Sequence, residues 1–225
     1  MSTPHDDAIR TNRANWDSRV PFHEQGYGLE RYRTDPTYLS DTVRYDVPRL
    51  GPIADLSVVH LQCHIGTDTV SLGRLGARMT GLGFSPAAAE QGRRLAQLAG
   101  VEADFVVADA YDAADVLGRH TFDLVFTGIG ALCWLPDIQR WARVVAELLA
   151  PGGRLFLREG HPMMWAVDDT RSDGLLALAY PYFETEALVF DEPGTYVTTD
   201  AVLQHSVSHS WNHGIGEIIS AILDA

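Results

Sequence analysis

Short apolar runs alternate with helix-like stretches about five times between Ser57 and Glu159. Each run is short enough to be a strand, and glycine, proline or serine separates it from the helical pattern beside it. Because a strand–helix–strand unit closes with a right-handed crossover, its repetition builds one sheet with helices on both faces. The sequence therefore predicts an α/β fold with a Rossmann-like, doubly wound and mostly parallel sheet. The predicted strands are 57–62, 79–82, 103–107, 122–127 and 154–159, and the predicted helices are 68–78, 86–99, 112–117 and 136–149.

The segments on either side of this core (57–159) have other patterns, although we predict one domain over residues 1–225. Residues 1–50 are polar with scattered aromatic side chains, which predicts one or two helices that form an N-terminal lid. Alternating stretches at 180–184, 187–190 and 203–211 predict an antiparallel flap within 160–213, after the fifth strand. Residues 214–225 contain a last predicted helix, at 215–223.

The aromatic residues Trp16, Phe22 and Tyr27 of the N-terminal segment are candidates for the inner side of the lid. Trp165 and the flap from 180 to 196 would complete it. Apolar walls with a few polar groups suit a small molecule. The alternative is that these aromatic residues only dock the N-terminal helices onto the sheet.

Charge and cysteine content exclude several classes of protein. The chain has 17 basic and 30 acidic residues, a formal charge of −13, so it lacks the basic surface that nucleic-acid binding needs. Two cysteines far apart in the sequence, Cys63 and Cys133, make no disulfide framework. The first residues show no basic start followed by an apolar block, and no apolar run is long enough to cross a membrane. We expect a cytoplasmic protein with no nucleic-acid or membrane partner.

The loops after the strands carry the candidate site, because open α/β sheets bind ligands at the carboxyl ends of their strands. In order and spacing, five segments resemble the class I S-adenosylmethionine-dependent methyltransferases. They are Leu61-Gln-Cys-His-Ile-Gly-Thr-Asp-Thr, Gly81-Leu-Gly-Phe-Ser-Pro, Ala108-Asp-Ala, Phe122-Asp-Leu-Val-Phe and Leu149-Ala-Pro-Gly-Gly. The first loop is similar to that of a bacterial subgroup with the sequence Leu-Gln-Cys-His-x-Gly-x-Asp-Thr, and so are the flap and the segment Trp211-Asn-His-Gly-Ile-Gly-Glu.

The resemblance implies a fold, a cofactor and a set of binding residues. The cofactor would be S-adenosylmethionine, and the reaction methyl transfer to a small-molecule acceptor. The resemblance also implies further strands that close the sheet after the last helix, and we predict no strand after residue 223 of this sequence. The cofactor-binding residues that it implies are His64, Gly66, Gly83, Phe84, Asp109, Ala110, Tyr111, Thr127, Gly128 and Ile129.

Two positions depart from the family pattern. The first loop of the family has an acidic residue and three glycines, where this chain has His60, Gln62, His64 and Gly66. The second strand of the family ends in an acid that binds both ribose hydroxyls, and this chain has Gly83 there. Loss of a charge-assisted hydrogen bond weakens binding about ten- to a hundred-fold. The alternative function is therefore a non-catalytic, methyltransferase-like protein with weakened cofactor binding that serves as a ligand-binding or partner subunit.

The resemblance also assigns roles that have structural alternatives. Asp109 would accept the adenine amino group, or it only caps the short helix that follows. Thr127–Ile129 would lie where cofactor sulfur and acceptor meet, or they form a plain turn. His64 would donate to the cofactor or fill space. His161 is the predicted catalytic residue, a base or an acceptor-positioning group, and its alternative is a turn histidine before Pro162.

Other chemistries are disfavoured. His60, Cys63 and His64 are metal-ligand types, but no fourth ligand can be placed, so we predict no metal. Gly83-Phe-Ser-Pro-Ala is like a hydrolase elbow, yet Pro86 has no N–H for the oxyanion, so Ser85 is predicted to be a helix cap. A nicotinamide enzyme would need more glycines than Gly66 alone and an acid at position 83.

The fifth strand would leave an exposed edge if no further strand pairs with it. Unpaired edges invite association. We therefore expect either a homodimer through that edge or a chain that lacks the closing strands.

Overall fold

The computed structural model describes residues 4–168, 170–200 and 202–225. Five strands form one parallel sheet, as the alternation in the sequence predicts, and the structure gives their order as β3-β2-β1-β4-β5. They are β1 (Ser57–Leu61), β2 (Arg78–Gly83), β3 (Ala103–Val107), β4 (Phe122–Thr127) and β5 (Leu149–Leu157). From β1 the chain adds β2 and β3 on one side of the sheet, and it then crosses to the other side to add β4 and β5. The loops after β1 and β4 therefore lie at the position where the strand order switches, which is where such sheets bind ligands.

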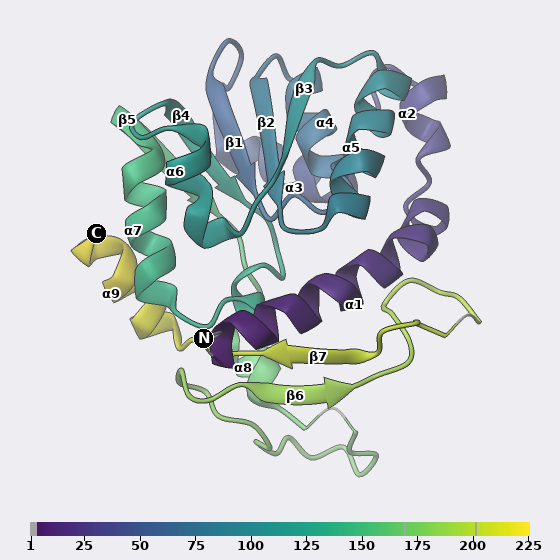
Figure 1. Cartoon of the computed structure of the whole chain (residues 1–225), viewed down its shortest axis with the longest axis vertical. Helices are drawn as coiled ribbons and strands as arrows, with labels where there is room; N and C mark the ends of the chain where they lie inside the picture. The colour runs from purple at the N-terminus through teal and green to yellow at the C-terminus, as the bar shows by residue number, and fades with distance from the viewer. Residues whose placement is uncertain (1–3, 169, 201) are drawn as a thin grey trace.

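Helices cover both faces of the sheet (Figure 1). On one face lie α6 (Ala113–Leu117), α7 (Ile138–Leu148) and α9 (Ile215–Asp224). On the other lie α3 (Asp41–Leu50), α4 (Thr67–Arg74) and α5 (Pro86–Ala99). None of the helices in the described ranges is long and apolar enough to cross a membrane.

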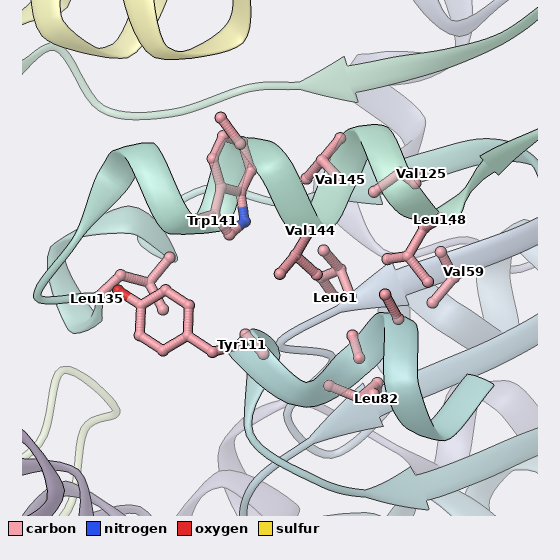
Figure 2. Packing of buried hydrophobic residues seen from close by; sticks show 14 of the residues in the cluster. Val59, Leu61, Leu82, Tyr111, Val125, Leu135, Trp141, Val144, Val145 and Leu148 are labelled. Carbon is pink, nitrogen blue, oxygen red and sulfur yellow. The ribbon is translucent and has the colours of Figure 1, made fainter. Parts of the chain in front are cut away.

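The α7 helix shows why the sequence packs this way. Its apolar residues recur every three to four positions, so Trp141, Val145 and Leu148 fall on one side. Figure 2 shows them against the strand residues Val59 and Val125, and all five are buried. Trp141 is the largest of the fully buried side chains, and its loss would cost about 3–5 kcal/mol.

Within residues 4–56, three helices precede the sheet, against one or two predicted. They are α1 (Pro4–Gly26), α2 (Glu30–Thr34) and α3. In Figure 1, α1 runs across one end of the sheet and lies between the sheet and the two-stranded flap. The predicted lid segment therefore lies at the end of the sheet where its loops carry the candidate site.

The flap is antiparallel but shorter than predicted. It consists of β6 (Leu188–Asp191) paired with β7 (Val207–Ser210), in the register Leu188↔Ser210. Residues 180–184, predicted to be extended, form no strand. Pro181 in their midst has no N–H to donate to a neighbouring strand, and its carbonyl instead accepts from the Asn212 side chain. A short helix, α8 (Pro162–Ala166), leads into the flap and was not predicted.

Two boundaries moved for local reasons. The first core helix ends at Arg74 rather than 78, because Gly76 adopts φ +93° and turns the chain into β2. The fifth strand starts at Leu149 rather than 154, with an irregularity in its pairing to β4. At Gly153 a Cβ would lie 2.9 Å from the carbonyl oxygens of Ala150 and Phe122, so the close approach requires glycine. Within the described ranges, β5 pairs only with β4.

Candidate functional site

A pocket lies at the carboxyl ends of β1, β2 and β3, beneath α1. The space between its atoms is about 370 Å³, and this volume includes space that is open to solvent. Most of its walls are apolar or aromatic. The lining residues are Ile9, Asn12, Gln62, Leu82, Gly83, Phe84, Asp109, Ala110, Tyr111, Trp134, Leu135 and Pro136.

Five of the ten predicted cofactor residues line this pocket. Gly83 and Phe84 come from the end of β2, and Asp109, Ala110 and Tyr111 come from the turn after β3. These two loops are neighbours because β2 and β3 pair directly, and the Ala108 amide donates to the Gly83 carbonyl at 3.1 Å. Strand order thus brings together residues that are about twenty-five positions apart in the sequence.

Asp109 serves as a cap, as its structural alternative predicts. Its Oδ1 accepts a hydrogen bond from the Tyr111 amide at 2.9 Å, which caps the 3₁₀ turn η1 (Ala110–Asp112). Burial raises the pKa of Asp109, the charge of Asp112 adds to the rise, and the Tyr111 amide opposes it. A carboxylate has two oxygens, so capping through Oδ1 leaves Oδ2 for a ligand.

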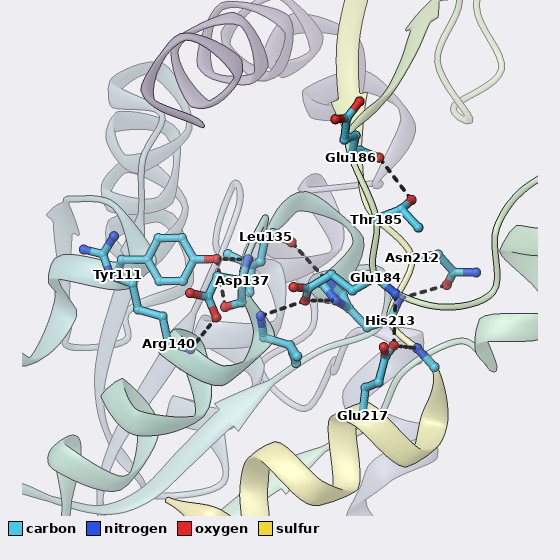
Figure 3. Close-up of polar contacts among 12 residues, drawn as sticks. Tyr111, Leu135, Asp137, Arg140, Glu184, Thr185, Glu186, Asn212, His213 and Glu217 are labelled. Carbon is cyan, nitrogen blue, oxygen red and sulfur yellow. Dashed lines mark hydrogen bonds and ion pairs between the residues drawn. The ribbon is translucent and has the colours of Figure 1, made fainter. Parts of the chain in front are cut away.

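The ring of Tyr111 forms a fixed wall of the pocket. Its hydroxyl donates to the Asp137 carbonyl at 3.0 Å and accepts from the Asp137 amide at 2.7 Å. Figure 3 shows this hydroxyl against Asp137, just before α7 begins. The Arg140 guanidinium lies over the ring, 4.4 Å from its centre. These contacts hold the ring in one orientation and exhaust the hydrogen-bonding capacity of its hydroxyl.

Gly83 leaves room for a side chain at the end of β2. A Cβ built there would meet the Cys63 Sγ at 3.7 Å, the Cys63 N at 3.9 Å and the His64 N at 4.0 Å, all ordinary contacts. Neither steric crowding nor a positive φ requires glycine at this position. The departure from the family pattern at position 83 therefore concerns the side chain and not the backbone.

Gln62, at the end of β1, also lines the pocket, and sequence reasoning did not select it. Its Nε2 donates to the Ala131 carbonyl at 2.9 Å, whereas its Oε1 is buried without a hydrogen-bond partner. Its backbone is left-handed, with φ +56°. The signal in the sequence was an amide residue at a position that the related enzymes fill with glycine.

His64 and Gly66 of the same loop do not line the pocket. The His64 Nε2 lies 2.6 Å from Nδ1 of His23 in α1, and burial lowers the pKa of both rings, that of His23 to about 4. At Gly66 a Cβ would lie 2.6 Å from the ring of Phe105, and φ is +81°. Gly66 is thus needed where the start of α4 packs on β3.

The turn after β4 lies beside a second group of polar side chains. Thr127 is buried at the end of β4, and Ile129 is 54% exposed. A Cβ built on Gly128 would lie 3.7 Å from Oδ2 of Asp68 and 3.8 Å from Nε2 of His60. Burial raises the pKa of Asp68 to about 6, with a smaller rise from the charge of Asp46, opposed by Ser40 and Arg158. A carboxyl group that titrates there can accept or donate a proton near neutral pH.

The α1 helix covers the first loop through Trp16, one of the aromatic residues that the sequence analysis selected. The Trp16 ring meets those of His64, at 4.8 Å between centres, and Trp134, at 5.2 Å. Tyr27 bonds through its hydroxyl to Tyr196 of the flap segment. Phe22 makes no such ring contact among the described residues, and Trp165 is 42% exposed at α8.

Two buried asparagines join α1 to the flap, and sequence reasoning missed them. Asn12 donates to the His209 carbonyl at 2.8 Å and accepts from the His209 amide at 2.7 Å. Asn15 donates to the His205 carbonyl at 2.8 Å. The signal that could have revealed them is in the sequence: asparagine is a poor helix former, and two asparagines lie three residues apart within one helical segment.

His161 lies at the amino end of α8 and is exposed. Its Nδ1 accepts from the Met163 amide at 3.2 Å, which makes it a helix cap. Glu159, two residues before it, organises the loop after β4. Its carboxylate accepts from the amides of Gly130, of Ala131 at 2.8 Å and of Leu132 at 3.0 Å. This loop contributes the Ala131 carbonyl that holds Gln62.

The other reactive residues have structural partners. His60 Nδ1 lies 2.9 Å from the Thr69 hydroxyl, and burial raises the pKa of the Cys63 thiol to about 12. Ser85 caps α5 by accepting from the Ala88 amide at 3.0 Å, as predicted. His213 contacts the Leu135 carbonyl and Glu184, both at 2.8 Å, and so fastens the flap beside the pocket wall (Figure 3).

Comparison with known proteins finds matches to the core of this chain. Residues 59–155 match the family model described as "Methyltransferase domain". The ubiquinone biosynthesis O-methyltransferase of Xanthomonas axonopodis pv. citri (strain 306) is 35% identical over 125 residues, 54% of this chain and 51% of that protein. The chain thus spans about half the length of the curated relatives that it matches.

Two solved structures share the fold over most of the chain. One is an S-adenosylmethionine dependent methyltransferase from Mesorhizobium loti, with a TM-score of 0.60 and 22% identity, covering 80% of this chain and 78% of that one. The other is a putative S-adenosylmethionine dependent methyltransferase from Listeria monocytogenes, with a TM-score of 0.63 and 14% identity, covering 81% and 78%. The segment 59–155 therefore matches a methyltransferase domain in sequence, and the chain shares the fold of these two structures.

Proposed function

We propose that this protein transfers a methyl group from S-adenosylmethionine to a small-molecule acceptor. The observation that carries the proposal is the pocket at the strand ends, where Gly83, Asp109 and Tyr111 lie together beneath α1. When bound, the cofactor supplies a methyl carbon on a positively charged sulfur, which a nucleophile displaces in line. The name of the curated relative, an O-methyltransferase, favours oxygen as the accepting atom.

The chemistry of the lining residues suits an adenosyl group. Asp109 would accept a hydrogen bond from the adenine amino group through the oxygen that its cap does not use. Phe84, Tyr111 and Leu135 would flank the base with apolar surface. The buried Oε1 of Gln62, which lacks a partner, also favours a ligand that brings hydrogen-bond donors.

The chain's own part in the reaction is to position the acceptor and exclude water. Trp16 and Trp134 close the space above the first loop. If the acceptor carries a proton, two residues are candidates for the base that removes it. They are Asp68, beside Gly128, and His161, the predicted base at the start of α8. Replacing each by Asn would separate them, since Asn retains the ability to cap α8. The variant that removes the base should lower kcat and change its pH profile.

Calorimetric titration of the protein with S-adenosylmethionine tests the proposal, and Asp109→Asn sharpens it. Asn caps as well as Asp, but its NH₂ would face the adenine amino group. We expect binding about ten- to a hundred-fold weaker in Asp109→Asn, with unchanged thermal stability. Wild-type protein that does not bind at millimolar cofactor would refute the proposal. Unchanged binding in the variant would leave Asp109 only its capping role.

Release of S-adenosylhomocysteine in the presence of hydroxyl-bearing small molecules then tests turnover. Product release that depends on one acceptor class supports an enzyme. Tight binding without turnover on any of them favours the ligand-binding alternative.

For the setting of this activity, we propose a cytoplasmic protein that binds no nucleic acid. The formal charge of −13 and two free cysteines support this placement. Retention on a heparin column at physiological salt would contradict the absence of nucleic-acid binding.

A further inference from the structure

The polar groups that line the pocket are mostly occupied by the protein itself. Both amide atoms of Asn12 bond the His209 backbone, and the Tyr111 hydroxyl bonds the Asp137 backbone twice. Among the amide, hydroxyl and carboxylate groups of the described lining, two acceptors remain: the second oxygen of Asp109 and Oε1 of Gln62. A ligand that satisfies these two acceptors must bring hydrogen-bond donors.

Gln62 is held so that its free oxygen is fixed. The bond from its Nε2 to the Ala131 carbonyl determines which end of the amide is which, because a carbonyl can only accept. Oε1 is therefore the end without a partner, and it is buried. Buried acceptors in proteins are nearly always bonded, so an orphan at the wall of a pocket points to a missing donor.

The backbone of Gln62 supports a functional reason for this side chain. Its φ of +56° lies in the left-handed region, where residues other than glycine are uncommon. His64, two residues on, shares this conformation with φ +49°. Glycine would adopt the left-handed conformation at both positions with less strain. The chain therefore carries an amide side chain at position 62 although the backbone conformation there favours glycine.

Gln62 also lies beside the end of β2. A Cβ on Gly83 would be 3.9 Å from the Cys63 N and 4.0 Å from the His64 N, the atoms of the chain directly after Gln62. Gly83 offers no side-chain acceptor of its own. Of the two free acceptors in the pocket lining, Gln62 directly precedes the Cys63 and His64 amides that lie beside Gly83. Asp109 lies on a different loop, the turn after β3.

We propose that Gln62 Oε1 accepts a hydrogen bond from a ribose hydroxyl of the bound adenosyl cofactor. This inference rests on the proposed function. The cofactor brings three kinds of donor: the adenine amino group, the ribose hydroxyls and the ammonium group of its amino-acid part. In this assignment Asp109 takes the first and a ribose hydroxyl satisfies the orphan on Gln62, which the deoxy analogues distinguish from a bond to the ammonium group. An uncharged amide thereby does part of what a carboxylate at position 83 would do.

Calorimetry with S-adenosylhomocysteine and its 2′-deoxy and 3′-deoxy analogues tests the proposal. Gln62→Met keeps the length of the side chain and removes the amide, and Gln62→Gly removes the side chain while easing the left-handed backbone. The matched control is Gln91→Met in α5, because the Gln91 Oε1 already accepts from Arg94 at 2.8 Å and lies outside the pocket lining. Thermal unfolding of each variant shows that it folds.

We expect both Gln62 variants to bind S-adenosylhomocysteine about five- to tenfold more weakly than wild type, and Gln91→Met to bind equally. Wild type should lose a similar factor when one ribose hydroxyl is removed, whereas the Gln62 variants should lose little more. Gln62 variants that bind as tightly as wild type would overturn the inference. So would weaker variants that still lose the full factor on the deoxy analogues. If wild type binds no S-adenosylhomocysteine, the proposed function fails as well.

Discussion

Single residues set the character of the pocket. Gln62 and His64 both hold left-handed backbone where glycine would be easier, and both side chains are then used, one at the pocket and one against His23 of α1. Gly83 shows the reverse, a glycine with room for a side chain. Substitutions at these positions change chemistry more than they change the fold.

Gly83→Asp should tighten S-adenosylmethionine binding. The new Cβ makes only ordinary contacts, and a carboxylate there would add a charge-assisted hydrogen bond. Because Gln62 already offers one acceptor, we expect a gain of about tenfold in calorimetric affinity. Gly83→Asn, which has the same shape without the charge, should gain less. A folded Gly83→Asp protein with unchanged or weaker affinity would contradict this placement of the ribose.

Asp68→Asn should change how stability depends on pH. Burial raises the pKa of Asp68 to about 6 in the folded protein, above its ordinary 3.8. A raised carboxyl pKa contributes stability below pH 4 that is lost as the pH rises through 6. We expect wild type to lose about 1–2 kcal/mol of unfolding free energy relative to the variant between pH 4 and 7, since the side chain is only half-buried.

Urea titrations of wild type and Asp68→Asn at several pH values measure that difference. Subtracting one from the other removes the opposing contribution of His23, whose lowered pKa costs stability as the pH falls below 6.5. Asp104→Asn, at an exposed carboxylate in β3, is the control and should run parallel to wild type. Equal pH profiles for wild type and Asp68→Asn would show that the carboxyl is solvated.

At the scale of elements, α1 depends on the flap for its position. The side chains of Asn12 and Asn15 form hydrogen bonds with backbone groups of His209 in β7 and of His205 just before it. These bonds pair backbone groups that a neighbouring strand would otherwise pair. Asn12 is buried and also lines the pocket. Docking of α1 and closure of the pocket are therefore coupled through one residue.

Asn12→Ala should loosen α1. The substitution leaves the His209 amide and carbonyl unpaired, which costs about 1–3 kcal/mol. Urea unfolding gives the loss in stability, and limited proteolysis within α1 gives its local part. Arg10→Ala, which removes an exposed ion pair with Asp7 on the same helix, should cost less than about 0.5 kcal/mol. Similar losses in the two variants would mean that the asparagine contacts add little.

For the whole molecule, β5 is one of the two edge strands of the described sheet, and β3 is the other. In the described ranges β5 pairs only with β4, and an edge strand can add a strand from another chain. We expect light scattering to give a mass of twice the 24.7 kDa of one chain, with association through this edge. A monodisperse monomer over the micromolar range would contradict that expectation.

The sequence by itself determined the sheet and its helices. Periodicity and turn residues are local signals, so the five strands, the Ser85 cap and the helix that ends before Gly100 could all be predicted. The same signals placed the loops that hold Gly83, Asp109 and Tyr111 at one end of the sheet. They failed at 180–184, where alternation indicated a strand but Pro181 could not pair.

Only the tertiary structure decided which side chains complete the pocket. Asn12 meets His209 across 197 positions of sequence, and Gln62 meets Ala131 across 69. Such partners leave no periodic trace, because a hydrogen bond between distant residues depends on how elements pack and not on local spacing. An acceptor without a partner, such as Gln62 Oε1, becomes visible only after every neighbouring donor has been placed.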